Sequence, residues 1–137
     1  MSKTHREFVR FAIAGAVGFV VDAGVLYIAL TGGCGPYLGR ALSFLCAAFV
    51  TWQINRRITF TGRANGSLWK EWYQYLLAMS FGGACNYTVY AVALKLLPKG
   101  PAAPALAVAA GSIAGMFVNF LTAKLWVFRS KRTQTSR

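Results

Sequence analysis

Apolar residues fill four long stretches of the chain, and short polar breaks separate them. The stretches are Phe8–Leu30, Tyr37–Ile58, Trp72–Leu96 and Ala103–Val127. A helix of about 20 apolar residues crosses a hydrocarbon core of roughly 30 Å, so each stretch is long enough to span a membrane. The first and third breaks contain glycine and proline, which favour tight turns. The pattern predicts an all-α integral membrane protein with four transmembrane helices in two hairpins, forming one domain over residues 1–137.

The two predicted hairpins resemble each other in sequence. Phe49–Phe60 is matched by Phe117–Phe128, 68 positions later, and each segment ends with a basic residue followed four positions on by phenylalanine. Earlier positions match at an offset of 64, as Asp22 and Asn86 illustrate. Because each half holds two spans, both halves start from the same side of the membrane, which predicts a parallel tandem repeat about an axis along the membrane normal. The predicted halves cover residues 8–60 and 72–128.

Composition favours a membrane protein. The chain is 56% hydrophobic and only 13% charged, with a mean hydropathy of +0.46. A protein of 137 residues with this composition cannot bury its apolar surface in one water-soluble core, so that surface must face lipid.

The net charge of +12 comes from fifteen basic and three acidic residues, and their positions decide what it means. Twelve basic residues fall at the two ends and in the middle connection: Lys3, Arg6, Arg10, Arg56, Arg57, Arg63, Lys70, Lys124, Arg129, Lys131, Arg132 and Arg137. Only Arg40, Lys95 and Lys99 lie toward the other side. Cytoplasmic loops are rich in Lys and Arg, so this asymmetry predicts that both termini are cytoplasmic. The charge thus indicates membrane topology, and no nucleic-acid partner is expected.

Each predicted helix carries small and polar residues on one face. In chain order these stripes are Gly15, Gly18 and Asp22; Arg40, Ser43, Ala47, Thr51 and Asn55; Gly82, Asn86 and Tyr90; and Ser112, Gly115, Asn119 and Thr122. Small residues let helices approach closely, Gly111–Gly115 is a GxxxG motif, and amides form hydrogen bonds between helices. Polar side chains in a bilayer are also costly and often functional. Helix packing and a polar path therefore both remain open for the three asparagines.

Asp22 is the acidic residue that lies deepest in a predicted span. At ~1.5 Å per residue it lies roughly 12 Å from the outer end of its helix. Arg40 lies in the first turn of the next span, and a long arginine side chain can reach inward. An Asp22–Arg40 pair is therefore predicted, either as structural neutralisation or as part of an outward-facing head-group site.

A second basic cluster is predicted at the cytoplasmic boundary. Arg10, Arg56, Arg57 and Lys124 come from three helices and all lie near that interface. Guanidinium groups bind phosphate through two parallel hydrogen bonds, and lysine adds a point charge. These residues are candidates for phosphate binding, and the alternative is that they only set topology and anchor the protein to lipid head groups.

Residues that carry out catalysis or bind metals are scarce. The chain has three cysteines, one histidine and three acids: Cys34, Cys46, Cys85, His5, Glu7, Asp22 and Glu71. None of them has ligand spacing, and the acids lie far apart along the chain. The sequence therefore predicts no catalytic residues, no metal site, no cofactor and no enzymatic activity.

Several of these features together resemble the GtrA-like membrane proteins. They are the four short spans, the early Phe11-x-x-x-Gly15-x-x-Gly18 pattern and the endings Asn55-Arg56-Arg57-x-x-Phe60 and Lys124-x-Trp126-x-Phe128. The resemblance covers roughly Arg6–Arg129, and the Asn-Arg-Arg-x-x-Phe ending is its most specific part. Ala123 lies at the position in the second half that matches Asn55 in the first, so the two halves need not contribute equally to a shared site.

The resemblance implies flipping of a polyprenyl-phosphate-linked monosaccharide, such as undecaprenyl-phosphate glucose, across the bacterial cytoplasmic membrane for cell-surface polysaccharide or glycolipid modification. The four cations of the boundary cluster would then bind the phosphate. The residues expected to contact the sugar are Trp52, Gln53, Asn55 and Asn119, and those expected to line the outer half of the path are Asp22, Arg40 and Asn86.

Other functions remain open. A non-transporting accessory subunit that recruits or stabilises a polyprenyl-phosphate glycosyltransferase would use the interfacial aromatic residues near Trp69–Tyr75 more than the buried polar ones. A small multidrug exporter usually needs a membrane-buried acid for cationic drugs, whereas the interfacial cations here favour an anionic ligand. Four helices make a thin wall around a sugar, so a homo-oligomer is expected, most simply a dimer.

Overall fold

The computed structural model describes residues 1–62 and 66–129, and four α-helices make up most of this part of the chain. They are α1 (Lys3–Thr31), α2 (Pro36–Ile54), α3 (Leu68–Leu96) and α4 (Ala103–Thr122). Two short π-helical turns continue α2 and α4: η1 (Asn55–Thr59) and η2 (Ala123–Val127). Within the described ranges there is no β-strand. The predicted all-α architecture is confirmed.

Local sequence explains where several helices begin and end. The Ser2 hydroxyl accepts a hydrogen bond from the His5 backbone N–H, and Ser67 does the same for Lys70, so both long helices begin at a serine cap. After α1 the chain turns at Gly33, whose φ of 90° lies in the left-handed region that glycine tolerates. The third helix ends at Leu96, and the next residue, Leu97, is extended because it precedes a proline.

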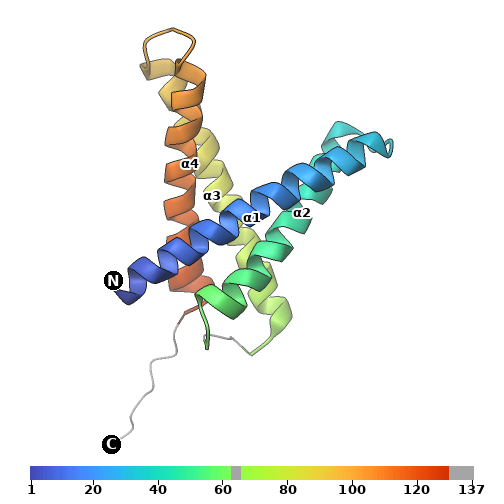
Figure 1. Cartoon of the computed structure of the whole chain (residues 1–137), viewed down its shortest axis with the longest axis vertical. Coiled ribbons are helices and arrows are strands. Elements are labelled where there is room, and N and C mark those ends of the chain that lie inside the picture. The colour runs from blue at the N-terminus through green and yellow to red at the C-terminus, as the bar shows by residue number, and fades with distance from the viewer. Residues whose placement is uncertain (63–65, 130–137) are drawn as a thin grey trace, which may run out of the picture.

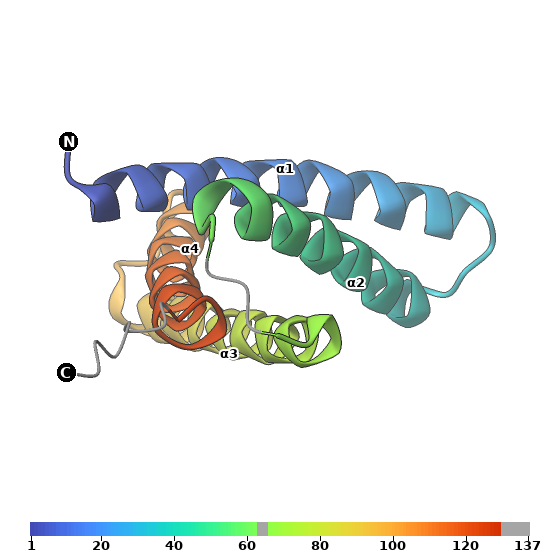
Figure 2. The same ribbon diagram turned by 90° about the horizontal axis from the view of Figure 1, so that it is seen from below.

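The helices form two antiparallel hairpins, α1 with α2 and α3 with α4 (Figure 1). The hairpins share a base and diverge from it, and the view in Figure 2 shows them as two layers. The start of α1, both π-helical turns and the start of α3 meet at this base. Among the described residues, no Cα atom of α1 lies within 8 Å of a Cα atom of α3. Contact between the hairpins is therefore concentrated at the base, and the arms stand apart.

The largest buried side chains form an aromatic core at the base. Phe60 and Phe128 stack with ring centroids 5.0 Å apart, and Phe60 contacts Phe11 while Phe128 contacts Tyr75. All four residues are at most 5% exposed. Aromatic pairs of this kind stabilise a core by about 0.5–1.5 kcal/mol beyond the burial of their area. The core thus holds the two hairpins together at one end.

Positions that match between the halves of the sequence make equivalent contacts. The Phe60 N–H donates to Asn55 O over 2.8 Å, and the Phe128 N–H donates to Ala123 O over 2.7 Å, so both hairpins end in the same wide turn. Phe8 contacts Phe120 across the hairpins at 5.2 Å, and the matching residues Trp72 and Trp52 do so at 5.3 Å. Each contact joins one half of the chain to the other.

The arms are apolar and face outward. Val20 is 69% exposed and Ile28 69% exposed, which is the arrangement expected of side chains in lipid. Three of the described helical segments are long and apolar enough to cross a membrane: Lys3–Thr31, Leu68–Leu96 and Ala105–Val127. The helix α2 is not in this set; its 19 residues include the polar side chains of Arg40 and Gln53. The chain is a multi-pass membrane protein.

Candidate functional site

A cavity of about 380 Å³ lies between the arms, next to the base. All four helices and η1 contribute to its wall. Six polar side chains line it: Thr51, Asn55, Tyr75, Asn86, Ser112 and Asn119. Apolar residues and glycines complete the wall, among them Phe11, Gly15, Phe19 and Gly83. The cavity therefore combines an apolar lining with a few polar groups, which is typical of small-molecule sites.

A chain of hydrogen bonds crosses the wall nearest the base. The Tyr75 hydroxyl donates to Thr51 Oγ1 over 3.0 Å and accepts from Asn55 Nδ2 over 2.9 Å. On its other side, Asn55 Oδ1 accepts from the Thr59 hydroxyl over 2.8 Å. Asn55 is only 1% exposed, so these bonds fix the orientation of its amide. The predicted sugar contact Asn55 thus also has a structural role, and Tyr75 is a polar cavity residue that the sequence analysis missed.

The other two asparagines lie where α3 and α4 pack most closely. Asn119 packs against Gly82, and a Cβ atom on that glycine would overlap the Asn119 amide. Asn86 packs against the GxxxG motif of α4. A Cβ atom added at Gly115 would lie only 2.8 Å from the Asn86 Cβ atom. The predicted packing role is therefore confirmed for Gly82, Gly111 and Gly115, whereas Gly15 meets no atom within 4 Å and lines the cavity. Among the described residues no group bonds to Asn119 Oδ1, which is buried, so this oxygen could accept a hydrogen bond from a ligand.

All four predicted phosphate-binding cations lie at the base. Arg56 Nε is 2.8 Å from Glu71 Oε1, and Lys124 Nζ is 2.9 Å from Glu7 Oε2. Arg10 donates to the Ile58 carbonyl over 3.1 Å and is exposed. Arg57 is exposed as well. The cluster therefore has two exposed guanidinium groups and two cations that already hold carboxylates.

The two carboxylates at the base are buried. Glu71 has a side-chain exposure of 1% and Glu7 of 6%. Trp52, a predicted sugar contact, instead donates from Nε1 to Glu71 Oε1 over 3.0 Å and lies outside the cavity wall. The sequence analysis noted only that the acids are far apart along the chain. Glu7 and Glu71 are 64 positions apart, the same offset as between Asp22 and Asn86. This offset could have shown that the two glutamates hold equivalent positions in the two halves.

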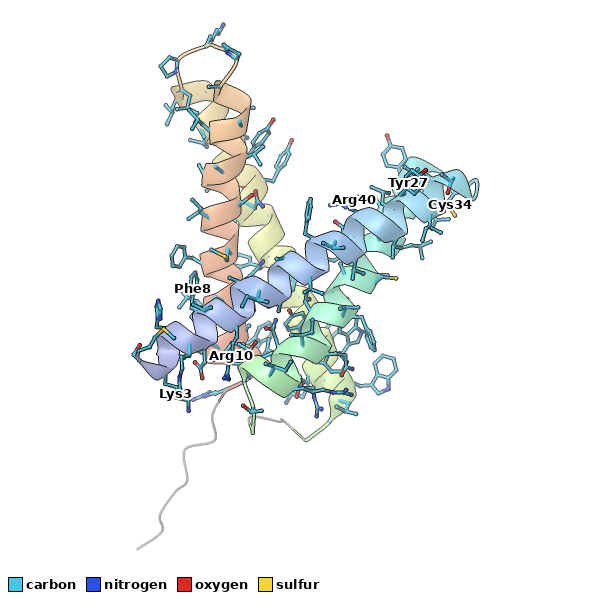
Figure 3. All side chains as sticks on the ribbon, in the orientation of Figure 1. Lys3, Phe8, Arg10, Tyr27, Cys34 and Arg40 are labelled. Atoms are coloured by element: carbon cyan, nitrogen blue, oxygen red, sulfur yellow. The ribbon has the colours of Figure 1, made fainter. Side chains whose placement is uncertain are left out.

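The predicted pair of Asp22 and Arg40 forms, with Arg40 Nη1 2.6 Å from Asp22 Oδ2. It lies within the first hairpin and outside the wall of the cavity. Figure 3 shows Arg40 on the same arm as Tyr27 and Cys34, at the opposite end of α1 from Lys3. Gln53, the remaining predicted sugar contact, is half-buried and also lies outside the cavity wall.

All three acids of the chain therefore have a basic partner. In the part of the chain that the structure describes, no three His, Cys, Asp or Glu side chains gather as metal ligands would. The cavity offers amides and hydroxyl groups, and the base offers cations. This arrangement can bind an uncharged, hydroxyl-rich group beside an anion.

Apolar arms, a polar cavity between them and cations at one end define a multi-pass helical membrane protein with a polar site between its helices. The family model of the GtrA/DPMS transmembrane domain matches residues 10–128, and the chain belongs to this family. The family indicates a membrane protein of glycosyl-lipid related processes. No match to the chain was found among curated proteins.

Proposed function

We propose that this protein flips a polyprenyl-phosphate-linked monosaccharide, such as undecaprenyl-phosphate glucose, across the bacterial cytoplasmic membrane. The observation that carries the proposal is that the polar cavity adjoins the cations of the base. Asn55 lines the cavity and directly precedes Arg56 and Arg57 in the chain. Asn119 lies five residues before Lys124, a separation of about 7.5 Å along a helix. A phosphate held at the base would therefore leave its sugar beside the cavity.

The cavity suits a monosaccharide in size and chemistry. Its volume of about 380 Å³ falls within the range of roughly 300–1,000 Å³ typical of small-molecule sites. Amide side chains both donate and accept hydrogen bonds, and so do the hydroxyl groups of a sugar. Asn86, Asn119 and Ser112 contact the sugar in this proposal, while Asn55 and Tyr75 hold the wall nearest the base.

The phosphate first meets the exposed cations. Arg10 and Arg57 are the two members of the cluster that face outward, and a guanidinium can bind two phosphate oxygens at once. Arg56 and Lys124 lie behind them with their carboxylate partners. The prenyl chain extends into the lipid along the exposed apolar side chains of the arms.

The membrane arrangement is part of the proposal. Both termini and the middle connection lie in the cytoplasm, since the described basic residues near the base far outnumber Arg40, Lys95 and Lys99 on the arms; Arg63 and the basic residues after Arg129 lie outside the described residues. The helix α2 spans the membrane as the other three do, and the two hairpins form a parallel tandem repeat. The functional unit is a homodimer that has no catalytic activity of its own.

Transport by the cavity can be tested by filling it. A Cβ atom added at Gly83 or at Gly24 would meet no atom within 4 Å, so a side chain can start from either position without a clash at its Cβ atom. Only Gly83 lines the cavity. In proteoliposomes that hold a polyprenyl-phosphate glucose, Gly83→Leu should slow the appearance of this lipid on the opposite leaflet by about tenfold or more. The reason is that the leucine side chain displaces the sugar from its position in the cavity. Gly24→Leu should move the lipid as fast as the wild type, and equal rates for all three proteins would contradict the proposal.

One observation favours a second function, that of an accessory subunit for a polyprenyl-phosphate glycosyltransferase. Trp69 is 81% exposed and Tyr73 62% exposed at the start of α3, next to the base. Exposed aromatic residues mark protein interfaces as well as membrane boundaries. No protein-dependent movement of the lipid, together with co-purification of a glycosyltransferase that Trp69→Ala abolishes, would favour this function.

A further inference from the structure

Two ion pairs at the base cross from one hairpin to the other. Arg56 follows α2 in the first hairpin and contacts Glu71 at the start of α3. Lys124 follows α4 in the second hairpin and contacts Glu7 at the start of α1. Each hairpin thus supplies one cation and one carboxylate. The two cations are 68 positions apart and the two carboxylates 64, the same offsets at which the rest of the chain matches.

Each pair has the composition of an anion-binding site. Glu71 Oε1 lies 2.8 Å from Arg56 Nε in an ion pair and accepts a hydrogen bond from Trp52 Nε1 over 3.0 Å. Lys124 Nζ lies 2.9 Å from Glu7 and also donates to Thr4 Oγ1 over 2.7 Å. A cation with neighbouring neutral donors or hydroxyl groups also binds a phosphate oxygen. The protein's own carboxylates therefore occupy two sites that suit a phosphate.

We propose that Glu71 and Glu7 are placeholders, and that the phosphate of a membrane lipid replaces them at Arg56 and Lys124 during transport. The proposal rests on the proposed function, which supplies the lipid. The ligand class is a phosphate ester with an apolar chain, and inorganic phosphate shares its chemistry.

Exchange of one anion for another keeps each cation paired. A buried cation left without any anion destabilises a protein strongly, whereas a buried ion pair as such adds little net stability. Arg10 and Arg57 are exposed at the same base and can hold the arriving phosphate before the exchange. The displaced Glu71 and Glu7 carboxylates then turn toward water and the exposed guanidinium groups of Arg10 and Arg57, so neither the cations nor the carboxylates are left uncompensated.

The exchange also acts on the two hairpins. It breaks the ionic contacts that join them, whereas the stack of Phe60 on Phe128 carries no charge and stays in place. The hairpins can then change their relative angle about this stack while the base remains assembled. Binding of the phosphate is thereby coupled to the opening of the cavity between the arms.

Trp52 gives a direct readout, because its indole N–H bonds to the carboxylate that should leave. In lipid nanodiscs, a protein with Trp52 as its single tryptophan would be titrated with farnesyl phosphate, farnesol and inorganic phosphate. Farnesyl phosphate should shift the Trp52 emission to saturation, and farnesol should not. An equal response to inorganic phosphate supports exchange by phosphate from any source. Unchanged emission with both phosphates overturns the proposal. This test needs no substitution of Glu71.

A neutral variant tests the competition itself. Glu71→Gln keeps an oxygen acceptor for Trp52 but removes the charge, so farnesyl phosphate should bind about tenfold more tightly by calorimetry, or about 1.4 kcal/mol. Glu7→Gln should act in the same direction. Asp22→Asn is the matched control, because it removes an ion pair on the arm, and its affinity should equal that of the wild type. A helical Glu71→Gln protein that binds no more tightly than the wild type overturns the proposal; if Glu71→Gln does not fold, the Trp52 titration decides.

The two proposals can fail separately. A Trp52 response with tighter binding by Glu71→Gln, but no transbilayer movement, would refute transport and leave the exchange intact. Transport with an unresponsive Trp52 would refute the exchange alone.

Discussion

Phe60 and Phe128 lie face to face, with ring centroids 5.0 Å apart and ring planes inclined by 18°. Each ring directly follows the π-helical turn that ends its hairpin. Both are at most 1% exposed. The stack therefore joins the two hairpins without the help of charge at the centre of the aromatic core, and it should contribute strongly to the stability of the assembled base.

Phe128→Ala should destabilise the protein by about 3–5 kcal/mol, because it leaves a cavity at the centre of the aromatic core. Phe60→Ala should have a similar effect. Unfolding in mixed micelles with increasing SDS, followed by circular dichroism, measures the change. Phe81→Ala is the control, since Phe81 is 59% exposed on an arm, and it should change the midpoint little. Equal losses at Phe81 and Phe128 would contradict the assignment of the core.

Gly82→Ala should separate α3 from α4, because the added methyl group would overlap the Asn119 amide. Overpacking of this kind destabilises a protein by about 1–3 kcal/mol. Gly24→Ala meets no atom within 4 Å and should leave stability unchanged or slightly raised, since alanine favours a helix by up to about 1 kcal/mol. The two midpoints of thermal unfolding in detergent should differ accordingly, and a Gly82→Ala protein as stable as the wild type would refute the close packing.

Tyr75→Phe removes the hydroxyl that bonds to Thr51 and Asn55. The buried Asn55 amide loses a partner, which should lower the free energy of unfolding by about 1–3 kcal/mol. Tyr73→Phe provides the control, because Tyr73 is 62% exposed on the same helix. Denaturant titration of both variants checks the difference. A loss no greater than that of Tyr73→Phe would mean that the hydrogen-bond chain contributes nothing to the wall of the cavity.

The pair of Asp22 and Arg40 lies outside the cavity, so we expect it to stabilise the first hairpin rather than to carry substrate. Asp22→Asn and Arg40→Gln should each lower stability, and the double variant should lose less than the sum, with a coupling of about 0.5–3 kcal/mol. Lipid movement in proteoliposomes should continue in the double variant. Loss of lipid movement in a double variant that is still stably folded would instead show that the Asp22–Arg40 pair belongs to the path of the substrate.

The proposed topology can be read from labelling of single cysteines. In a protein with Cys34, Cys46 and Cys85 replaced by serine, Lys3→Cys and Thr61→Cys should react with a membrane-impermeant maleimide only in inside-out vesicles. Lys99→Cys should react only in right-side-out cells, because it lies at the tip of the second hairpin. The opposite pattern would reverse the orientation, and reaction of Thr61 and Lys99 from one side would exclude α3 as a span.

Much of the fold could be predicted because hydropathy and turn residues act locally. The four helices and their two hairpins follow from apolar length and from the glycine and proline turns. The helix α1 begins at Lys3 rather than at Phe8, because the cap at Ser2 starts the helix before the apolar stretch. The π-helical turns had no local signal, since a hydrogen bond to the fifth residue back leaves the hydrophobic pattern nearly unchanged.

The site was less predictable because its contacts join distant parts of the chain. Asn55, Asn86 and Asn119 were found, since polar residues in apolar stretches stand out. The partners of Arg56 and Lys124 were not found, because they depend on how the two hairpins cross at the base. Trp52 was expected beside the sugar, but its indole faces Glu71 instead. Side-chain direction within an interfacial cluster is thus a property of the packed hairpins.

The later member of each ion pair described above lies at a different point along the chain, at Arg40, Glu71 and Lys124, and this gives the protein an order of assembly during biosynthesis. Asp22 and Arg40 can meet as soon as the ribosome has delivered the first hairpin. Arg56 meets Glu71 when α3 begins to insert. Lys124 arrives last, and its contact with Thr4 spans 120 positions. At about 5–20 residues per second, roughly 6–24 s separate the synthesis of these two ends. The base therefore closes only after Lys124 has been synthesised, and a chain truncated before Lys124 would enter the membrane with both arms begun but with their junction unfinished.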